Sequence, residues 1–245
     1  MKLGILGYGE IGGSIAKLYL PSDVILIEDV KLNSKIVEDV EILHVCIPYS
    51  NDFIDIVTEC VDKIKPKLTI IHSTVKVGTT KQLFDKGMKV VHSPVRGMHP
   101  NITESLRTFD KFIGSDDLEI GLKALNHFKE IGVPALLLKT SSASELGKLL
   151  DTTYYGVCIS FHAYANELCE KVGVPVEDVM GLFNETYNEG YLRMGVSNVV
   201  RPVLHPPKGK IGGHCVVPNA ILLQEQFGKD VILQRIMGKC KENKK

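Results

Sequence analysis

Hydrophobic and polar positions alternate in blocks along the first 140 residues of the chain. Seven short apolar runs have the length and composition of buried strands. They are residues 2–6, 24–27, 42–47, 68–71, 89–91, 112–114 and 135–138. Helical periodicity occupies residues 10–20, 53–64 and 118–131 between them. Because strands that alternate with helices indicate βαβ units, we predict an α/β fold with a doubly wound parallel sheet, a Rossmann domain over residues 1–140.

The pattern changes after about residue 140. From Ser141 to Val172 apolar residues recur every three or four positions, which predicts one helix roughly 45 Å long. A further helix is predicted to begin at Pro175 and another to cover 216–237, whereas 195–213 is a loop rich in proline and glycine and 238–245 is a frayed polar tail. We therefore predict an all-α domain over residues 141–245, whose long helix pairs two subunits of a homodimer.

Composition narrows the class of protein. The chain has 29 Lys and Arg against 29 Asp and Glu, a balance that argues against a nucleic-acid partner. No apolar run approaches the roughly 18 residues that cross a bilayer, and glycines interrupt residues 1–16, so neither a membrane span nor a signal peptide is expected. The six cysteines show no CxxC and no zinc spacing, which predicts no metal site and a reduced, cytoplasmic protein.

A glycine-rich motif, Gly7-Tyr8-Gly9-Glu10-Ile11-Gly12, follows the first predicted strand and opens a helix. In such a turn the first glycine permits the tight bend, the second lets the backbone approach a pyrophosphate, and the third lets helix and strand pack closely. The free N–H groups at the helix start attract phosphate. This context predicts a dinucleotide site.

An acidic pair, Glu28-Asp29, ends the second predicted strand about 20 residues after the motif. A carboxylate there accepts hydrogen bonds from the adenosine ribose hydroxyls and repels a 2′-phosphate. We favour Asp29 for this role, with Glu28 as the substitute, and hence NAD over NADP.

Polar residues follow other strands, at the edge where an open α/β sheet binds ligands. Pro48 follows 42–47, and Ser73 and Thr74 follow 68–71, where they are candidates to bind the nicotinamide ribose or orient a water. Turn chemistry is the alternative for both hydroxyls. Arg96 is a candidate clamp for an anionic substrate group, and His99 is either a proton-transfer residue or a structural histidine.

A polar stripe runs along the long predicted helix. Glu145, Lys148, Thr152 and Tyr155 repeat at spacings of three or four, which by itself indicates a solvated face. A lysine near the start of an interdomain helix can also hold a substrate alkoxide, so Lys148 keeps a catalytic alternative.

The segment Gly212-Gly213-His214-Cys215 leads directly into the helix predicted at 216. The dipole of that helix lowers the pKa of a thiol at its start, and thiolate is the reactive form of cysteine. His214 adds positive charge beside it. A buried, inert thiol is the usual alternative for a free cysteine, but it fits Cys215 poorly.

Together these segments resemble the UDP-glucose/GDP-mannose dehydrogenase family, within the wider 6-phosphogluconate dehydrogenase-like group. The matching stretches occur in the family's order. They read GYGEIG, VCIP, HSTVKVGTT, HSPVRG, SELGKLLDTTYYGVCISFHAYANELCEKVGV and GKIGGHCVVPNA.

The resemblance implies an NAD-dependent oxidation of an alcohol to an acid. Cys215 would trap the intermediate aldehyde as a thiohemiacetal that is oxidised to a thioester and hydrolysed. By the same resemblance, Lys148 stabilises the oxyanion and Thr74 positions the catalytic water. Arg96, Thr152 and His214 are the expected substrate-binding residues, with the small-molecule substrate between the two domains.

The chain departs from the family pattern at four positions. Val95 and His99 stand where acids are typical, Thr152 where an asparagine is expected, and Asn219 where an acid follows the cysteine by four. We also expect a shortened form that lacks the family's third, nucleotide-sugar-binding domain.

Two other functions stay open. One is a two-electron hydroxyacid or prephenate-like dehydrogenase that uses Lys148 or His99, with Cys215 a bystander. The other is a non-catalytic dinucleotide-binding protein, which the residues Val95 and Asn219 favour.

Overall fold

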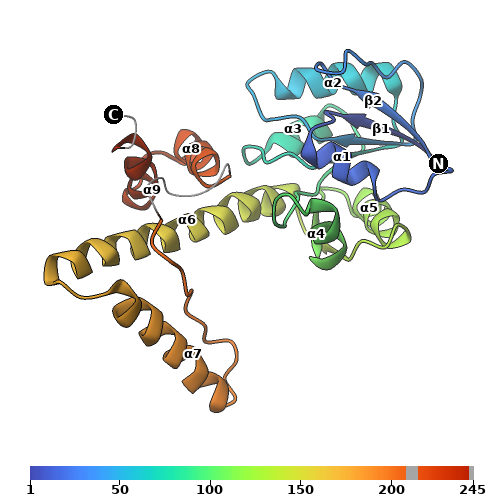
Figure 1. The fold of residues 1–245 in the computed structure, drawn as a ribbon. Helices are drawn as coiled ribbons and strands as arrows, with labels where there is room; N and C mark the ends of the chain where they lie inside the picture. The colour runs from blue at the N-terminus through green and yellow to red at the C-terminus, as the bar shows by residue number, and fades with distance from the viewer. Residues whose placement is uncertain (208–214, 243–245) are drawn as a thin grey trace. The chain divides into compact units, whose positions relative to one another are not determined.

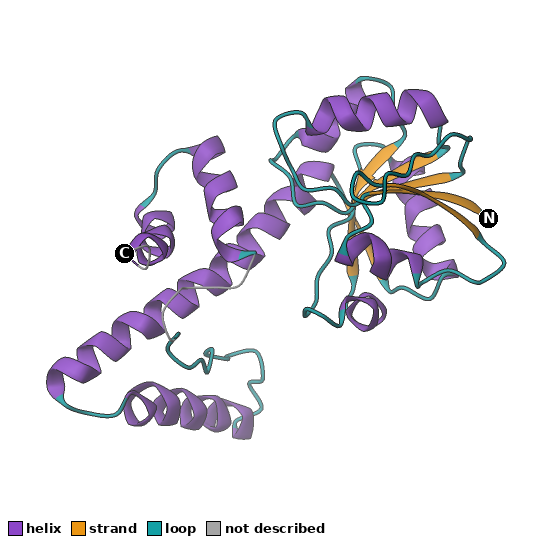
Figure 2. Cartoon of the chain, turned by 45° about the horizontal axis from the view of Figure 1, so that its top comes forward, coloured by secondary structure: helices purple, strands orange, loops and turns teal. Residues whose placement is uncertain are grey.

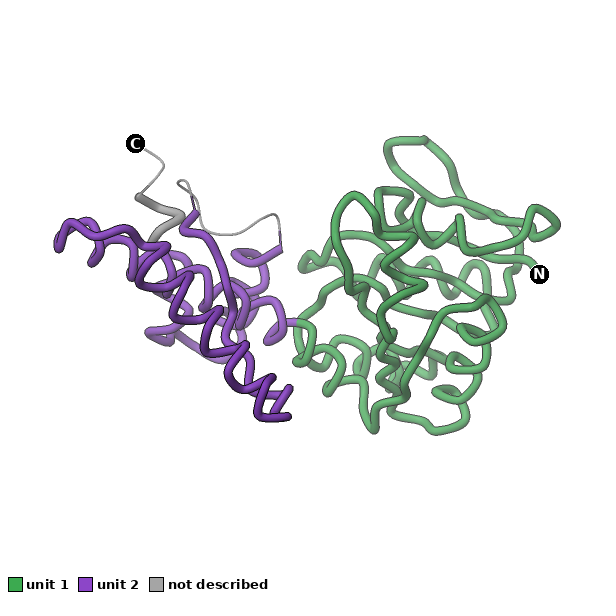
Figure 3. The backbone as a smooth tube through the Cα atoms, turned by 60° about the horizontal axis from the view of Figure 1, so that its bottom comes forward, with its two compact units in different colours: residues 1–148 green, residues 149–245 purple. Residues whose placement is uncertain are grey.

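The computed structural model describes residues 1–207 and 215–242, the last five of them by their main chain alone. The chain divides into two compact units, Met1–Lys148 and Leu149–Lys245 (Figure 3). Each unit is described by itself below. The functional boundary at residue 140 stays a prediction.

Unit 1 is built on a seven-stranded sheet in the order β2-β1-β3-β4-β5-β6-β7. The strands are β1 (Lys2–Leu6), β2 (Val24–Glu28), β3 (Ile42–Val45), β4 (Leu68–Ile71), β5 (Val90–His92), β6 (Lys111–Gly114) and β7 (Ala135–Leu138). This arrangement confirms the predicted α/β Rossmann-type fold. The strands coincide with the apolar runs because a strand covered on both faces is apolar throughout.

One strand pair corrects the prediction of a wholly parallel sheet. β5 and β6 pair antiparallel, with His92 opposite Gly114, whereas every other neighbouring pair is parallel. After His92 the chain turns back along β6 instead of crossing the sheet to enter from the same edge, so β6 runs in the opposite direction.

Helices cover both faces of the sheet of unit 1 (Figures 1 and 2). They are α1 (Glu10–Ala16), α2 (Phe53–Ile64), α3 (Thr79–Asp85), α4 (Ile102–Thr108) and α5 (Leu118–Glu130). One core cluster joins Leu3 and Ile5 of β1 to Phe128 of α5, and the other joins Leu6 to Phe53 of α2. Neighbouring residues of β1 serve opposite cores because side chains alternate along a strand.

Two short helices, α3 and α4, were not expected from the sequence. Each has seven residues, too few to show a helical period. α1 is shorter than predicted, since it ends at Ala16 and not at Leu20.

Unit 2 is helical, as predicted. The long helix α6 spans Ser141–Val172, as expected; its first turns belong to unit 1 and the rest to unit 2. A π-helical turn, η1 (Glu177–Gly181), leads into α7 (Leu182–Arg193). No helix in residues 1–207 or 215–242 is long and apolar enough to span a bilayer.

The single helix predicted over 216–237 is wrong. Two helices are present, α8 (Val216–Phe227) and α9 (Val231–Glu242), and α9 extends into the predicted frayed tail. The break lies at Gly228, whose φ of 93° is incompatible with a continuing right-handed helix. The Asp230 carboxylate then accepts the N–H of Ile232 and starts α9.

Candidate functional site

The three glycines of the turn after β1 have different surroundings. Gly7 has a φ of 91°, and a Cβ on Gly12 would lie 2.1 Å from the Gly7 carbonyl oxygen. Apart from Gly9 itself and its two chain neighbours, no heavy atom of the described residues lies within 4 Å of the Cβ position of Gly9. Gly7 and Gly12 are therefore required by the turn itself, whereas Gly9 leaves room for another molecule, as the backbone at a pyrophosphate site must.

The carboxylate of Asp29 lies against this turn. Its Oδ2 accepts the N–H of Tyr8 at 2.7 Å, and its Oδ1 accepts the N–H groups of Lys31 and Leu32. These bonds, that from Tyr8 foremost, lower the pKa of Asp29. A carboxylate offers about four acceptor positions, so one on Oδ2 is left for a hydroxyl. Glu28 faces elsewhere, because its Oε2 accepts the N–H of Ile36.

The turn lies where the strand order reverses. β1 has β2 on one side and β3 on the other, and ligands of open α/β sheets bind at the carboxyl ends of strands at such a point. Pro48 is exposed just after β3, next to Ile47, whose side chain packs against Gly7. Thr74 follows β4 and is half-buried. The Ser73 hydroxyl donates to the Ile47 carbonyl at 2.6 Å, so it already serves the turn.

His99 reaches the glycine-rich turn from another part of the chain. Its Nδ1 lies 2.8 Å from Oε2 of Glu10, and both side chains are about half exposed. The hydroxyl of Ser105 accepts the N–H of Met98 and donates to the carbonyl of Asn101, which fixes the segment that carries His99. The structure thus joins two residues that the sequence predicted for different roles.

Glu145 corrects the expectation of a solvated face on α6. Its side chain is 1% exposed, and its two oxygens accept the N–H of Gly78 at 2.6 Å and of Thr80 at 2.8 Å. Burial raises its pKa. The carboxylate therefore caps α3 from a residue 65 positions away in sequence. The N-cap residue of α3, Gly78, has no side chain that could cap the helix, and no sign of this distant cap was present in the sequence because α3 itself was not expected.

Lys148 follows Glu145 by one helical turn and is half-buried. Its positive charge helps to lower the pKa values of His92 and Lys111. Arg96 lies with its guanidinium carbon 5.1 Å from the centre of the Phe112 ring.

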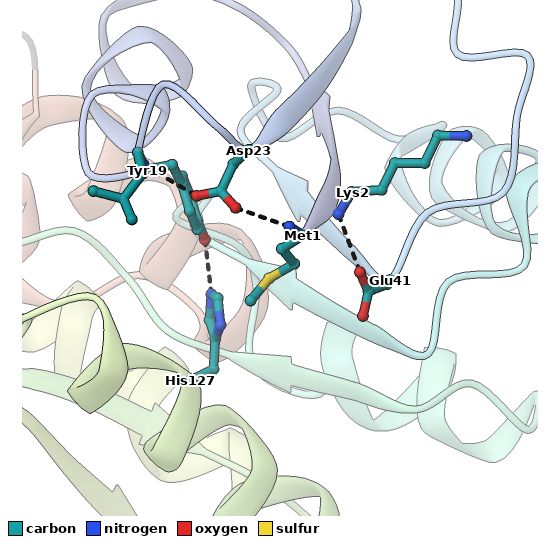
Figure 4. Close-up of polar contacts among 7 residues, drawn as sticks. Met1, Lys2, Tyr19, Asp23, Glu41 and His127 are labelled. Carbon is teal, nitrogen blue, oxygen red and sulfur yellow. Dashed lines mark hydrogen bonds and ion pairs between the residues drawn. The ribbon is translucent and has the colours of Figure 1, made fainter.

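A buried polar chain crosses the interior of unit 1, and the sequence analysis missed it. The Tyr19 hydroxyl lies 2.7 Å from Nε2 of His127 (Figure 4). The same hydroxyl lies 2.6 Å from Nε2 of His44. His44 Nδ1 in turn lies 2.9 Å from Nε2 of His72. Burial lowers the pKa values of the three histidines, so they are neutral at pH 7. Their scattered positions show no spacing that would predict contact.

Unit 2 carries the other predicted residues. Cys215 is exposed and immediately precedes α8, and Thr152 is half-buried on α6. Asn219, one turn after Cys215, is 4% exposed, and its Nδ2 has no hydrogen-bond partner in the described part of the chain. His214 lies outside the described residues. In unit 1, burial raises the pKa values of the Cys46 and Cys60 thiols to about 12.

Known proteins resemble this chain in sequence and in fold. No protein-family profile matches the chain. UDP-N-acetyl-D-mannosamine dehydrogenase of Methanococcus vannielii is 26% identical over 168 residues, which are 65% of this chain and 36% of the relative. The chain thus spans about a third of the length of that relative.

Two solved structures show the same fold. The structure of UDP-D-ManNAc dehydrogenase from Pyrococcus horikoshii matches 99% of this chain and 68% of its own with a TM-score of 0.79, at 19% identity. Mycobacterium tuberculosis 3-hydroxyisobutyrate dehydrogenase matches 98% of this chain with a TM-score of 0.71, at 15% identity. The resemblance to nucleotide-sugar dehydrogenases is thereby confirmed: UDP-N-acetyl-D-mannosamine dehydrogenases are homologues of this chain over part of their length.

Proposed function

We propose that the chain is an NAD-dependent oxidoreductase that oxidises an alcohol carbon of a nucleotide sugar. The observation that carries the proposal is the turn after β1, where Gly9 leaves open space and Asp29 accepts the N–H of Tyr8. The curated relatives, which are named for this activity, support it.

The residues of the turn fit NAD better than NADP. The main chain of residues 7–12 would hold the pyrophosphate, and the remaining acceptor position of Asp29 would take one ribose hydroxyl. The lowered pKa of Asp29 keeps it ionised, so a 2′-phosphate there would meet a negative charge. NAD, when bound, takes up the hydride that leaves the alcohol carbon.

The chain's own residues supply the remaining chemistry in this proposal. Loss of a hydride and a proton from the alcohol would give an aldehyde, and the Cys215 thiol would add to its carbonyl carbon, with the thiol proton passing to the oxygen, to form a thiohemiacetal. Loss of a second hydride, to a second NAD, and of the hydroxyl proton would give a thioester, which water hydrolyses to the acid and the free thiol. Lys148 donates to the substrate oxygen, Thr74 orients the water, and Arg96 and Thr152 bind polar parts of the substrate.

A stoichiometry experiment tests the proposal. Purified protein is given NAD with a limiting amount of UDP-N-acetyl-D-mannosamine or UDP-glucose, and NADH is counted against substrate consumed. We expect two NADH per substrate in the wild type, and a loss of acid formation by about a hundredfold or more in Cys215→Ser. Cys158→Ser is the control, because Cys158 lies on α6 and is not part of the proposed motif.

Other outcomes would identify the alternatives. One NADH per substrate, with Cys215→Ala fully active, would replace the four-electron route by a two-electron dehydrogenase. NAD binding without turnover on a panel of alcohols would show a non-catalytic dinucleotide-binding protein.

The two-electron alternative is favoured by specific residues. Val95 is 8% exposed and packs in a core cluster, and Asn219 is a buried amide. Neither position therefore supplies a carboxylate for hydrolysis of a thioester. The fold is also similar to that of a 3-hydroxyisobutyrate dehydrogenase.

We also propose a cytoplasmic homodimer, paired through α6. In support, large apolar side chains on this helix are exposed. They include Leu150, Tyr154, Tyr155, Phe161, Tyr164, Leu168 and Val172. The five cysteines whose side chains are described are all free thiols, as in a reducing compartment. Light scattering of the wild type and of Phe161→Glu tests the pairing: a dimer that Phe161→Glu turns into monomer supports it, and a monomeric wild type contradicts it.

A further inference from the structure

Lys111, the first residue of β6, is a buried lysine that the proposed chemistry does not use. Its side chain is 2% exposed. Nζ donates to the carbonyl oxygen of Ser93 at 2.7 Å and to that of Pro94 at 3.2 Å, and it lies 5.4 Å from the centre of the Phe128 ring. No carboxylate forms an ion pair with it in the described part of the chain.

Such a placement is costly. An ammonium buried without a counter-ion destabilises the fold, whereas a packed apolar residue of similar volume does not. Burial accordingly lowers the pKa of Lys111 to about 7. The titratable side chains that act on Lys111, or on which it acts, come from four neighbouring segments. They are His44 and Cys46, His72, His92 and Lys148.

The carbonyl that Lys111 binds is also the end of the buried polar chain. His72 Nδ1 lies 3.0 Å from the Ser93 carbonyl oxygen, which can only accept, so Nδ1 carries the proton. Neutral His72 therefore accepts a hydrogen bond at Nε2 from His44 Nδ1. His44 in turn accepts a hydrogen bond at Nε2 from the Tyr19 hydroxyl, whose oxygen accepts one from His127 Nε2. These tautomers follow from the network. Every hydrogen-bond donor of this buried polar chain therefore points toward Ser93.

The segment after Ser93 is held from the other face of β6 as well. Phe112 follows Lys111, and successive side chains of a strand point to opposite faces. The Arg96 guanidinium lies over the Phe112 ring. Two neighbouring residues of β6 therefore hold residues 93–96, one through carbonyl oxygens and one through the arginine itself.

We propose that Lys111 is a positioning residue, which gathers the carbonyls of Ser93 and Pro94 and so sets where Arg96 is presented to an anionic group of the substrate. The proposal rests on the proposed dehydrogenase function. It assigns to Lys111 an effect on substrate binding through Arg96, and no effect on the coenzyme, because the turn after β1 is built from other residues.

A double-mutant cycle with UDP-N-acetyl-D-mannosamine as substrate tests this role. Lys111→Met is expected to raise KM about tenfold, with kcat and the Kd for NAD within about twofold of the wild type. Because Lys111 acts through Arg96, the double variant with Arg96→Met should be no more than about twofold worse than Arg96→Met alone. Lys123→Met, the same change at an exposed lysine of α5, is the control and should match the wild type.

The pH dependence of KM gives a second kinetic readout. In the wild type KM should rise as pH increases through about 7, where Lys111 loses its charge, whereas KM of Lys111→Met should be high and independent of Lys111's titration. Additive effects of the two variants, or an unchanged pH profile in Lys111→Met, would overturn the proposal.

A wild type without turnover would refute the proposed function but not the role of Lys111. In that case a spectroscopic measurement tests whether Lys111 positions Arg96. The side-chain Nε–H resonance of Arg96, assigned through Arg96→Met, should shift with a midpoint near pH 7 in the wild type and in Lys123→Met, and should not do so in Lys111→Met. A resonance that does not move in the wild type, or moves equally in Lys111→Met, means that Lys111 does not position Arg96.

Discussion

The two units differ in their buried polar contacts and in their exposed apolar surface. In unit 1, buried polar side chains such as His72, Lys111 and Glu145 bond to main-chain groups far away in sequence. Buried side-chain atoms without a partner in the described part of the chain occur in both units, among them Thr80 Oγ1 in unit 1 and Ser160 Oγ in unit 2. In unit 2, however, much of the apolar surface of α6 is exposed. Long-range polar contacts thus fix unit 1, whereas the exposed apolar side chains of unit 2 are the ones on which the proposed dimer depends.

The largest effect is expected from the tightest contact in unit 1. Gly12→Val would place a branched side chain where Cβ alone lies 2.1 Å from the Gly7 carbonyl oxygen, so we expect a loss of about 3 kcal/mol or more in the free energy of unfolding. Urea denaturation measures it. Gly13→Ala, in the same helix with open space around it, should unfold at the same urea concentration as the wild type or higher.

Gly9→Ala separates folding from binding in the same turn. Its Cβ position is open and its φ of −77° suits alanine, so stability should be retained while calorimetry detects weakened NAD binding. Unchanged affinity would show that the dinucleotide does not approach this turn.

Acid should weaken unit 1 more than unit 2. His127 has a pKa of about 4 when folded and about 6.5 when unfolded, because burial disfavours its charged form. The unfolded chain therefore binds the extra proton between these values, and stability falls as pH decreases from 6.5 to 4, by about 3 kcal/mol for this one group. Hydrogen exchange at several pH values measures each unit. His127→Gln should flatten the dependence in unit 1, and equal acid sensitivity of both units would contradict the comparison.

An intermediate effect on the free energy of unfolding is expected at Glu145, whose carboxylate attaches the start of α6 to α3 within unit 1. Glu145→Ala leaves the buried N–H groups of Gly78 and Thr80 without their acceptor, which should lower the free energy of unfolding by about 2 kcal/mol. Glu170→Ala removes an exposed partner of Asn166 on the same helix and should cost less than about 0.5 kcal/mol. Equal thermal shifts for the two variants would show that burial does not distinguish them.

The smallest effects compare two glycines of α6. A Cβ on Gly156 would lie 2.4 Å from Cγ1 of Val216, so Gly156→Ala should destabilise unit 2 by about 1 kcal/mol as α8 shifts. Gly147 has open space, and Gly147→Ala should stabilise the helix by somewhat less than 1 kcal/mol. Denaturant titration measures both changes in stability. Opposite signs would show that α8 is held on α6 where Val216 approaches Gly156.

Most of the fold was predictable because it depends on local pattern. The strands of unit 1 are short apolar runs, and α6 is long enough for its period to define both ends. The break at Gly228 was missed because apolar residues continue in helical spacing across it, and the requirement is a backbone angle and not a side chain. The antiparallel β6 was missed because an apolar run does not reveal strand direction.

The candidate site was predictable in part. The glycine motif and Asp29 lie together because their spacing belongs to one βαβ unit. Glu145, Lys111 and the histidines near Tyr19 were not recognised, because their partners are main-chain atoms or side chains 25 or more residues away, which no local pattern encodes. The meeting of His99 with Glu10 is of the same kind.

Because the cysteines differ in exposure, a thiol reagent should label them selectively. An alkylating reagent attacks the thiolate, and the raised pKa values of Cys46 and Cys60 leave these two almost wholly as thiols at neutral pH. Cys169 is shielded by burial, whereas Cys215 is exposed. A fluorophore or spin label carried on a maleimide should therefore favour Cys215 over these three, so that attachment to the native protein reports directly on the residue proposed as the nucleophile.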